Sequence, residues 1–198
     1  MSKIYYFMGK SASGKDTIYK KIREMFPKLK TITLYTTRPI RDGEREGEAY
    51  YFVDEAKLEE LQKAGKVIEL RSYDTVCGEW KYFTVDDGQF NLEEEDFLMI
   101  GTLESYRKMQ EYFGTDVLVP LYIEVEDGER LMRALLRERE QKAPKYAEMC
   151  RRFLADTADF SEENLAALGI RERYENTDAE LALRKISERI RADIGNLR

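Results

Sequence analysis

Histidine is absent from the 198 residues of this chain, and its absence limits the chemistry that the protein can perform. A Ser-His-Asp triad and a Cys-His pair both need an imidazole to carry a proton, and many zinc sites need it as a ligand. Any reaction must therefore depend on lysine, arginine, carboxylate and hydroxyl groups, or on a hard metal ion.

Cysteines and long apolar stretches are scarce as well. Cys77 and Cys150 are the only two cysteines, and they lie too far apart in the sequence for a metal or disulfide motif, so we expect free thiols in a reducing compartment. The first apolar run, Ile4–Met8, is shorter than the roughly 7–15 residues of a signal peptide or the roughly 20 of a membrane span. These features predict a soluble cytoplasmic protein without a membrane partner.

Acidic residues outnumber basic ones by 39 to 33, which gives a net charge of −6. A protein that binds duplex nucleic acid normally presents a basic face, so this balance argues against a nucleic-acid partner. The hydrophobic fraction of 42% is sufficient for a core. The length of 198 residues fits one domain of the usual size, roughly 100–200 residues.

Apolar runs that alternate with helical patterns predict an α/β fold, with an open sheet of parallel strands flanked by helices. The predicted strands are Ile4–Met8, Thr31–Tyr35, Tyr50–Val53, Val67–Tyr73, Trp80–Val85, Phe97–Gly101 and Val117–Val125. The predicted helices are Lys15–Phe26, Asp54–Gly65 with Asp54 as its cap, Leu103–Phe113, Asp127–Arg139 and Asp178–Ile194. Antiparallel-looking strands interrupt the alternation within 54–96, with a hairpin turn expected at Asp74–Glu79. We interpret 33–96 as a small mixed α/β subdomain inserted into a core formed by 1–32 and 97–198.

A glycine-rich segment directly follows the first predicted strand and leads into the first predicted helix. It reads Gly9-Lys10-Ser11-Ala12-Ser13-Gly14-Lys15-Asp16-Thr17, and its G-x-x-x-x-G-K spacing is that of a phosphate-binding P-loop. Its two glycines permit a tight turn in which backbone N–H groups cradle phosphate oxygens, and the helix N-terminus adds its positive dipole. These nine residues are our candidate ATP site, in which Lys15 reaches the terminal phosphates as a catalytic group.

Asp16 stands where P-loops usually carry a Ser or Thr whose hydroxyl binds Mg²⁺. A carboxylate is a stronger ligand for this hard cation. Two interpretations stay open: Asp16 holds Mg²⁺ directly or through water, or it caps the helix while Thr17 supplies a nearby hydroxyl. The first interpretation makes Asp16 a candidate metal ligand, with ATP and Mg²⁺ as the cofactors.

An arginine-bearing loop follows the second predicted strand. Arg38 and Arg41 can hold one phosphate, each as a planar fork, and the Tyr50 hydroxyl can bind the same anion. Together with the P-loop, the segment from Thr36 to Val53 resembles the guanylate kinases. It matches their pattern T-T-R-x-x-R-x-G-E-x-x-G-x-x-Y-x-F-V at every fixed position.

The resemblance covers most of the chain and implies a monophosphate-binding subdomain, an arginine-rich lid and transfer of a phosphoryl group from ATP to a nucleoside monophosphate. The residues that it assigns to the acceptor are Arg38, Arg41, Tyr50, Glu69, Tyr82 and Thr84. Of these, Glu69 would accept hydrogen bonds from the guanine edge, while Tyr82 and Thr84 fall near a phosphate contact. Asn176 resembles the family's stretch beside the adenine of ATP.

The chain departs from the family where guanine is recognised. Leu34 stands in place of a serine that contacts the O6 atom of guanine, and Ile100-Gly101-Thr102 stands in place of an Asp-x-Asp stretch. Thr102 would replace a carboxylate with a hydroxyl. Because each buried polar contact contributes about 1–3 kcal/mol to selectivity, these losses predict GMP or dGMP as the preferred acceptor with relaxed discrimination against other bases.

Basic residues gather between positions 130 and 152, where phosphoryl transfer would benefit from cations because its transition state spreads negative charge over three oxygens. They are Arg130, Arg133, Arg137, Arg139, Lys142, Lys145, Arg151 and Arg152. The resemblance implies that Arg137 or Arg139, and Arg151 or Arg152, act as catalytic lid arginines on either side of a loop at Glu140–Ala147.

Two other functions remain open beside a nucleoside monophosphate kinase. One is a related small-phosphate kinase, for example one acting on ribose 1,5-bisphosphate, which the Gly-Lys-Asp ending of the P-loop and the missing Asp-x-Asp stretch favour. The intact Thr36–Val53 motif argues against it. The other is a non-catalytic module that binds phosphopeptides, against which the intact P-loop argues. The expected partners are small nucleotide substrates, and the sequence leaves the oligomeric state open.

Overall fold

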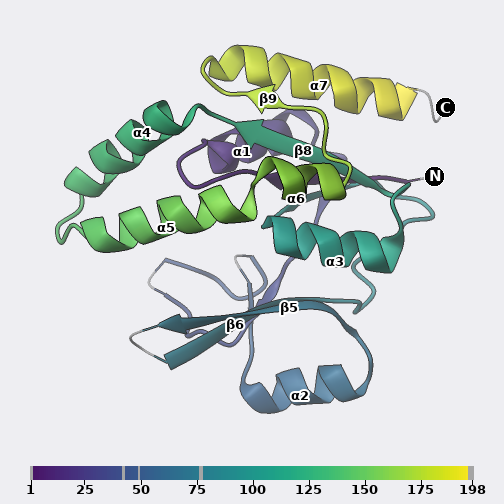
Figure 1. The fold of residues 1–198 in the computed structure, drawn as a ribbon. Helices are drawn as coiled ribbons and strands as arrows, with labels where there is room; N and C mark the ends of the chain where they lie inside the picture. Colours follow the sequence, from purple (N-terminus) through teal and green to yellow (C-terminus); the bar gives the residue numbers. More distant parts are fainter. Residues whose placement is uncertain (1, 42, 49, 76–77, 196–198) are drawn as a thin grey trace.

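The structure is a computed structural model that describes residues 2–41, 43–48, 50–75 and 78–195. Its central sheet has five parallel strands in the order β2-β7-β1-β8-β9, which confirms the predicted open α/β sheet (Figure 1). These strands are β1 (Ile4–Met8), β2 (Lys30–Thr31), β7 (Phe97–Ile100), β8 (Leu118–Glu124) and β9 (Tyr174–Glu175).

Helices cover both faces of this central sheet (Figure 1). One face is covered by α1 (Lys15–Met25) and α7 (Ala179–Gly195), and the other by α3 (Leu103–Phe113) and α6 (Glu162–Ala167). Two further helices, α4 (Asp127–Arg139) and α5 (Tyr146–Asp159), form a hairpin at one end of the sheet. Among the described residues, no helix is both long and apolar enough to cross a bilayer.

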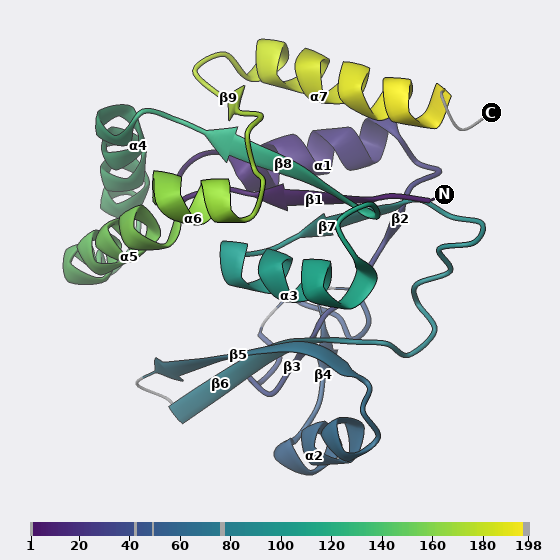
Figure 2. The same cartoon turned by 45° about the vertical axis from the view of Figure 1, so that its right-hand side comes forward.

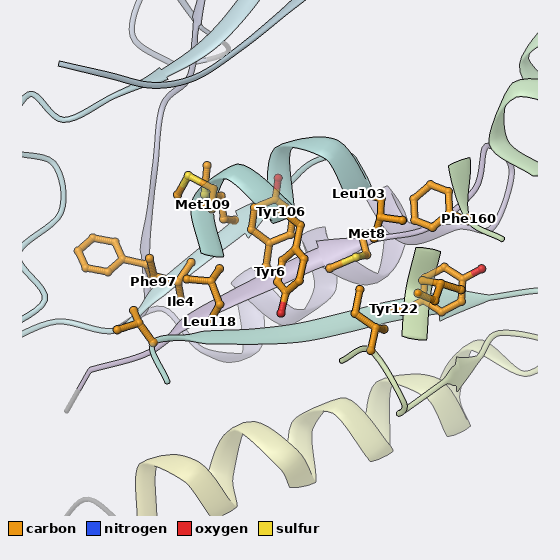
Figure 3. Packing of buried hydrophobic residues seen from close by; sticks show 14 of the residues in the cluster. Ile4, Tyr6, Met8, Phe97, Leu103, Tyr106, Met109, Leu118, Tyr122 and Phe160 are labelled. Atoms are coloured by element: carbon orange, nitrogen blue, oxygen red, sulfur yellow. The ribbon is translucent and has the colours of Figure 1, made fainter. Parts of the chain in front are cut away.

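The central strand β1 explains why both faces are covered, because all five of its residues are buried. Ile4, Tyr6 and Met8 pack on the α3 side, while Tyr5 and Phe7 pack against α1 and α7. Alternate side chains of a strand point to opposite faces, so an uninterrupted apolar strand belongs to two cores at once. Figure 3 shows the first of these cores, in which the Tyr6 ring lies 5.3 Å from that of Tyr106.

A second sheet lies beyond α3 and has the strand order β4-β3-β6-β5 (Figure 2). It consists of β3 (Tyr35–Thr36), β4 (Tyr51–Phe52), β5 (Val67–Thr75) and β6 (Gly78–Val85), with helix α2 (Glu55–Lys63) on its outer face. Asp54 caps α2, as predicted, by accepting a hydrogen bond from the Lys57 N–H. Ile68 on β5 joins the core under α3, so the two sheets share apolar contacts.

Two predicted elements are wrong in their bounds. The expected strand Thr31–Tyr35 is divided between the two sheets, because Thr31 pairs with β7 while Tyr35 pairs with β6. The expected turn Asp74–Glu79 is tighter, since Asp74 pairs with Glu79 and Thr75 with Gly78. The apex of that hairpin, including Cys77, lies outside the described residues.

Three elements, α5 (Tyr146–Asp159), α6 (Glu162–Ala167) and β9 (Tyr174–Glu175), were not predicted from the sequence. Helix α5 has no buried residue, so its pattern gives little sign of a core-facing stripe. The expected loop Glu140–Ala147 is shortened, because α5 begins at Tyr146. Cys150 lies on this helix and is an exposed free thiol, as expected.

Candidate functional site

The P-loop lies between β1 and α1, where the sequence analysis expects it. Gly14 adopts the left-handed region at φ 81°, and Ala12 does so at φ 63°. A Cβ atom at Gly9 would collide with the Ile123 carbonyl of β8, and one at Gly14 would collide with the Asn176 amide. Close packing around the loop therefore requires both glycines, and the left-handed backbone at Gly14 is a second reason for glycine there.

Contacts from distant parts of the chain hold the P-loop in place. The Asn176 amide donates to the Ser13 carbonyl at 2.7 Å. The N–H of Ser11 donates to the Asp156 carboxylate of α5 at 2.6 Å, and Arg130 lies 3.5 Å from the same carboxylate. Asn176, which the resemblance places beside the adenine, thus supports the loop in this structure, and its side chain is buried.

A cavity of about 220 Å³ opens over the P-loop. Its lining comprises Lys10, Ala12, Ser13, Gly14, Lys15, Asp16, Thr17, Arg133 and Arg137. Arg133 was not among the predicted site residues. It lies four residues before Arg137 on α4, and this helical spacing puts both side chains on one face. The four-residue spacing of the two arginines could therefore have identified Arg133 from the sequence.

Lys15 and Asp16 form an ion pair at 3.2 Å at the mouth of this cavity, and the Asp16 side chain is 82% exposed. The described residues include no group of three or more His, Cys, Asp or Glu side chains that would hold a metal ion by itself. One carboxylate beside the Thr17 hydroxyl nevertheless fits Mg²⁺, which usually keeps several waters and binds through one or two carboxylates together with substrate phosphates.

The other predicted lid arginines do not line this cavity. Arg151 and Arg152 both donate to Glu148 on their own helix, and these hydrogen bonds lower the pKa of Glu148 to about 2. Arg139 is exposed at the end of α4. Arg130 is buried, with its guanidinium 4.1 Å from the centre of the Phe153 ring, and it therefore belongs to the packing between α4 and α5.

Several residues predicted to bind the acceptor come together on and beside the second sheet. Arg38 is only 3% exposed and lies 5.1 Å from the centre of the Tyr50 ring, which in turn lies 5.6 Å from the Tyr82 ring. The Arg38 guanidinium donates to both Glu44 oxygens at 2.7 and 2.6 Å. These hydrogen bonds lower the pKa of Glu44 to about 2, so a bound phosphate would share Arg38 with a carboxylate.

The backbone N–H of Arg41 donates to the Glu44 carboxylate that Arg38 also holds, while the Arg41 guanidinium lies 5.6 Å from the centre of the Trp80 ring. Between α1 and the second sheet there is another cavity, of about 190 Å³. Its lining includes Leu34 and Tyr50, together with Ile100 from the end of β7. Leu34 and Ile100, the positions where the chain departs from its resemblance, thus give this cavity apolar walls.

Glu69 on β5 lies opposite Thr84 on β6, and its carboxylate is already paired. Thr84 Oγ1 donates to Glu69 Oε1 at 2.7 Å. Arg71, which the sequence analysis did not single out, donates to Glu69 Oε2 from Nε at 2.9 Å and to Oε1 from Nη2 at 3.2 Å. Burial acts to lower the pKa of Arg71, but the charge and hydrogen bonds of Glu69, together with the nearby tyrosines, raise that pKa overall.

The structure places Thr102 at the N-terminus of α3, where its side chain accepts a hydrogen bond from the Ser105 N–H at 3.2 Å. Its neighbour Gly101 lies against Tyr6, whose hydroxyl occupies the space that a Cβ atom would need. The Tyr6 hydroxyl donates to Ser105 at 2.6 Å. The packing of Tyr6 therefore favours glycine at position 101.

The chain is similar to known guanylate kinases in sequence and in fold. Residues 1–82 match the family model described as guanylate kinase. A guanylate kinase from Nostoc is 40% identical over 67 residues, which are 34% of this chain and 34% of that protein. One from Leifsonia xyli is 36% identical over 96 residues, which are 44% of this chain and 37% of that protein.

The aligned segments thus span about a third of the length of the curated relatives. A guanylate kinase structure from Anaplasma phagocytophilum superposes with a TM-score of 0.61 at 23% identity, over 97% of this chain and 86% of the other, which shows a common fold. The first 82 residues therefore resemble the guanylate kinase family in sequence, and nearly the whole chain shares the fold of a guanylate kinase structure.

Proposed function

We propose that this protein transfers the terminal phosphoryl group of ATP to a nucleoside monophosphate, with GMP and dGMP as the first candidates, and releases ADP and the diphosphate. The observation that carries the proposal is the cavity over the P-loop, where Lys15 and two arginines of α4 face the same space. Such a concentration of donors suits a transition state that spreads charge over three oxygens.

Each group has a defined role in this proposal. The P-loop N–H groups and Lys15 hold the donor phosphates, and Arg133 and Arg137 stabilise the charge that develops during transfer. Arg38 and Tyr50 orient the acceptor phosphate. Asp16 and Thr17 would hold Mg²⁺, which would neutralise phosphate charge when bound. No covalent intermediate on the protein is required for an in-line transfer.

The test is a coupled assay of ADP formation with ATP, Mg²⁺ and a panel of acceptors: GMP, dGMP, AMP, CMP, UMP and ribose 1,5-bisphosphate. We expect turnover of nucleoside monophosphates, with a guanine nucleotide preferred. Turnover of the sugar bisphosphate alone would favour the small-phosphate kinase. ATP binding without turnover of any acceptor would favour the non-catalytic module.

A substitution in the arginine loop tests the acceptor site separately. Arg38→Ala removes a charge-assisted contact of roughly 1.5–3 kcal/mol, so we expect acceptor binding to weaken by about ten- to a hundredfold while ATP binding stays unchanged. Arg45→Ala is the matched control, because Arg45 lies in the same loop with its side chain 78% exposed. Equal weakening of ATP and acceptor by Arg38→Ala would contradict this assignment.

A further inference from the structure

Arg71 and Glu69 form a buried ion pair on the inward face of the second sheet. They are two residues apart on β5, and their cross-strand partners on β6 are Tyr82 and Thr84, respectively. The side chains of Arg71 and Glu69 are only 8% and 1% exposed. The opposite face of the sheet packs on α2 through Phe83 and Val85, so this pair faces away from α2.

Arg71 binds Glu69 along the edge of the carboxylate where both oxygens can accept from one partner. Both of its oxygens accept from the Arg71 fork, and Oε1 also accepts from Thr84. A guanine presents two neighbouring N–H donors, at N1 and at the 2-amino group, and would need the same edge. Glu69 is therefore not free to accept from guanine while Arg71 holds it.

Arg71 also retains donors that the pair does not use. Its Nε and Nη2 atoms bond to Glu69, whereas Nη1 has no hydrogen bond to any residue that the structure describes. A guanidinium has five N–H donors, and Nη1 is not one of the fully buried side-chain atoms that lack a partner, so Arg71 keeps a donor that a ligand can reach. Burial raises the pKa of the Tyr6 and Tyr50 hydroxyls, and the charge of Arg71 opposes that rise at both, so Arg71 lies near β1 and near the arginine loop.

We propose that Arg71 determines acceptor specificity, by holding the edge of Glu69 and by donating from Nη1 to an oxygen of the acceptor. The site then selects a carbonyl or anionic oxygen instead of the N–H edge of guanine. This inference rests on the proposed function, because it assigns a substrate feature to the acceptor site of the same reaction.

Three purine monophosphates separate the two kinds of recognition. IMP has the 6-oxo group of GMP but lacks the 2-amino group, and AMP lacks the 6-oxo group. Calorimetric titration in the presence of a non-hydrolysable ATP analogue gives a Kd for each. We expect GMP and IMP to bind with Kd values within about threefold of each other. Both should bind about tenfold or more tighter than AMP, because AMP lacks the oxygen that would accept from the charged Arg71.

Arg71→Met removes the donor and frees the Glu69 edge. We expect the preference for IMP over AMP to fall about tenfold and the preference for GMP over IMP to rise about tenfold, because Glu69 can then accept from the 2-amino group. Arg71→Lys keeps the positive charge but loses the two-donor guanidinium, and it should shift both ratios in the same direction as Arg71→Met but by a smaller factor. The lysine variant tests the proposal even if the methionine variant does not fold. Arg189→Met, which removes a paired arginine on α7, is the matched control and should leave both ratios unchanged.

Several results would overturn the inference. These are a wild-type GMP preference over IMP above about thirtyfold, unchanged ratios in folded Arg71 variants, or equal weakening of all three ligands, which would indicate a purely structural pair. Absence of measurable binding by all three monophosphates would overturn it as well. Because binding is measured without turnover, a failure of phosphoryl transfer contradicts the proposed function and leaves these binding ratios as an independent result.

Discussion

Lys15 is the residue whose position in the structure bears most directly on the proposed phosphoryl transfer. It lines the P-loop cavity, and its ammonium group lies 3.2 Å from the exposed Asp16 carboxylate, which a bound nucleotide phosphate would replace as its partner. Lys15→Ala should lower kcat by about 100- to 1,000-fold, the usual effect of removing one donor that stabilises transition-state charge. The melting temperature should change little.

The measurement for this prediction is steady-state kinetics together with a thermal melt. Lys20→Ala, an exposed lysine on the same helix, serves as the control. Turnover within about tenfold of the wild type would exclude Lys15 from the phosphoryl-transfer site.

Glu44 gives a second prediction at the scale of one residue. Its pKa is lowered from 4.5 to about 2 by the hydrogen bonds from Arg38 and from the Arg41 N–H. Since the folded pKa lies below the unfolded one, the ionised carboxylate stabilises the fold above about pH 4.5, and this contribution is lost as the pH falls towards 2.

A carboxyl NMR titration of Glu44 measures this directly. The titration midpoint should move up towards 4.5 in Arg38→Met and stay low in Arg45→Met. A midpoint near 4.5 in the wild type would show that the Arg38–Glu44 pair does not form in solution.

At the scale of elements, the α4–α5 hairpin depends on polar contacts because α5 buries none of its residues. Asp156 joins α5 to the P-loop through the Ser11 N–H and to α4 through the buried Arg130. Asp156→Ala leaves Arg130 with Asp127 as its remaining ion-pair partner. We expect the free energy of unfolding to fall by about 1–3 kcal/mol, the cost of a buried polar group that loses a partner.

Urea denaturation measures this loss, and Asp159→Ala on the same helix is the control. The double variant Arg130→Met/Asp156→Leu should regain most of the stability, because apolar residues of similar volume often replace a buried ion pair without loss. If Asp156→Ala and Asp159→Ala destabilise the protein equally, the contact with Arg130 and the P-loop does not hold the hairpin.

At the scale of the whole molecule, the two sheets share the core under α3 through Ile68, so we expect them to unfold as one cooperative unit. The chain has a single tryptophan, Trp80, which lies on β6 and reports on the second sheet alone. A non-hydrolysable ATP analogue at 100 times its Kd should add about 2.7 kcal/mol of stability, which is roughly 5–10 °C for a chain of this length.

The Trp80 fluorescence melt and the far-UV circular dichroism melt should therefore shift by the same amount when the analogue binds at the P-loop. Two separate transitions, with Trp80 insensitive to the analogue, would show that the second sheet unfolds independently of the central sheet.

Local patterns determined much of the fold because they need only neighbouring residues to act. The apolar run Ile4–Met8 has the bounds of β1, and Asp54 caps α2 as its position before the helix indicates. The P-loop spacing placed Lys15 at the start of α1, beside a cavity. In contrast, the sequence pattern of 31–35 does not show that the chain leaves one sheet for the other, because that depends on which strands become available for pairing.

Tertiary structure decided which charged side chains are free to act. Arg71 and Glu69 are only two residues apart in the sequence, but the β5–β6 hairpin and the core bury both side chains. Because removing one partner of a buried ion pair is costly, Glu69 stays bound to Arg71. Likewise Asp156 and Ser11 are 145 positions apart, and only the packing of α5 brings them together. The sequence by itself determined the P-loop spacing and the arginine-bearing loop, since residue type and local backbone geometry fix these. The tertiary structure alone decided that Arg71 pairs with Glu69, the carboxylate expected to bind guanine. Burial and strand register control that contact, and neither can be deduced from a local sequence pattern.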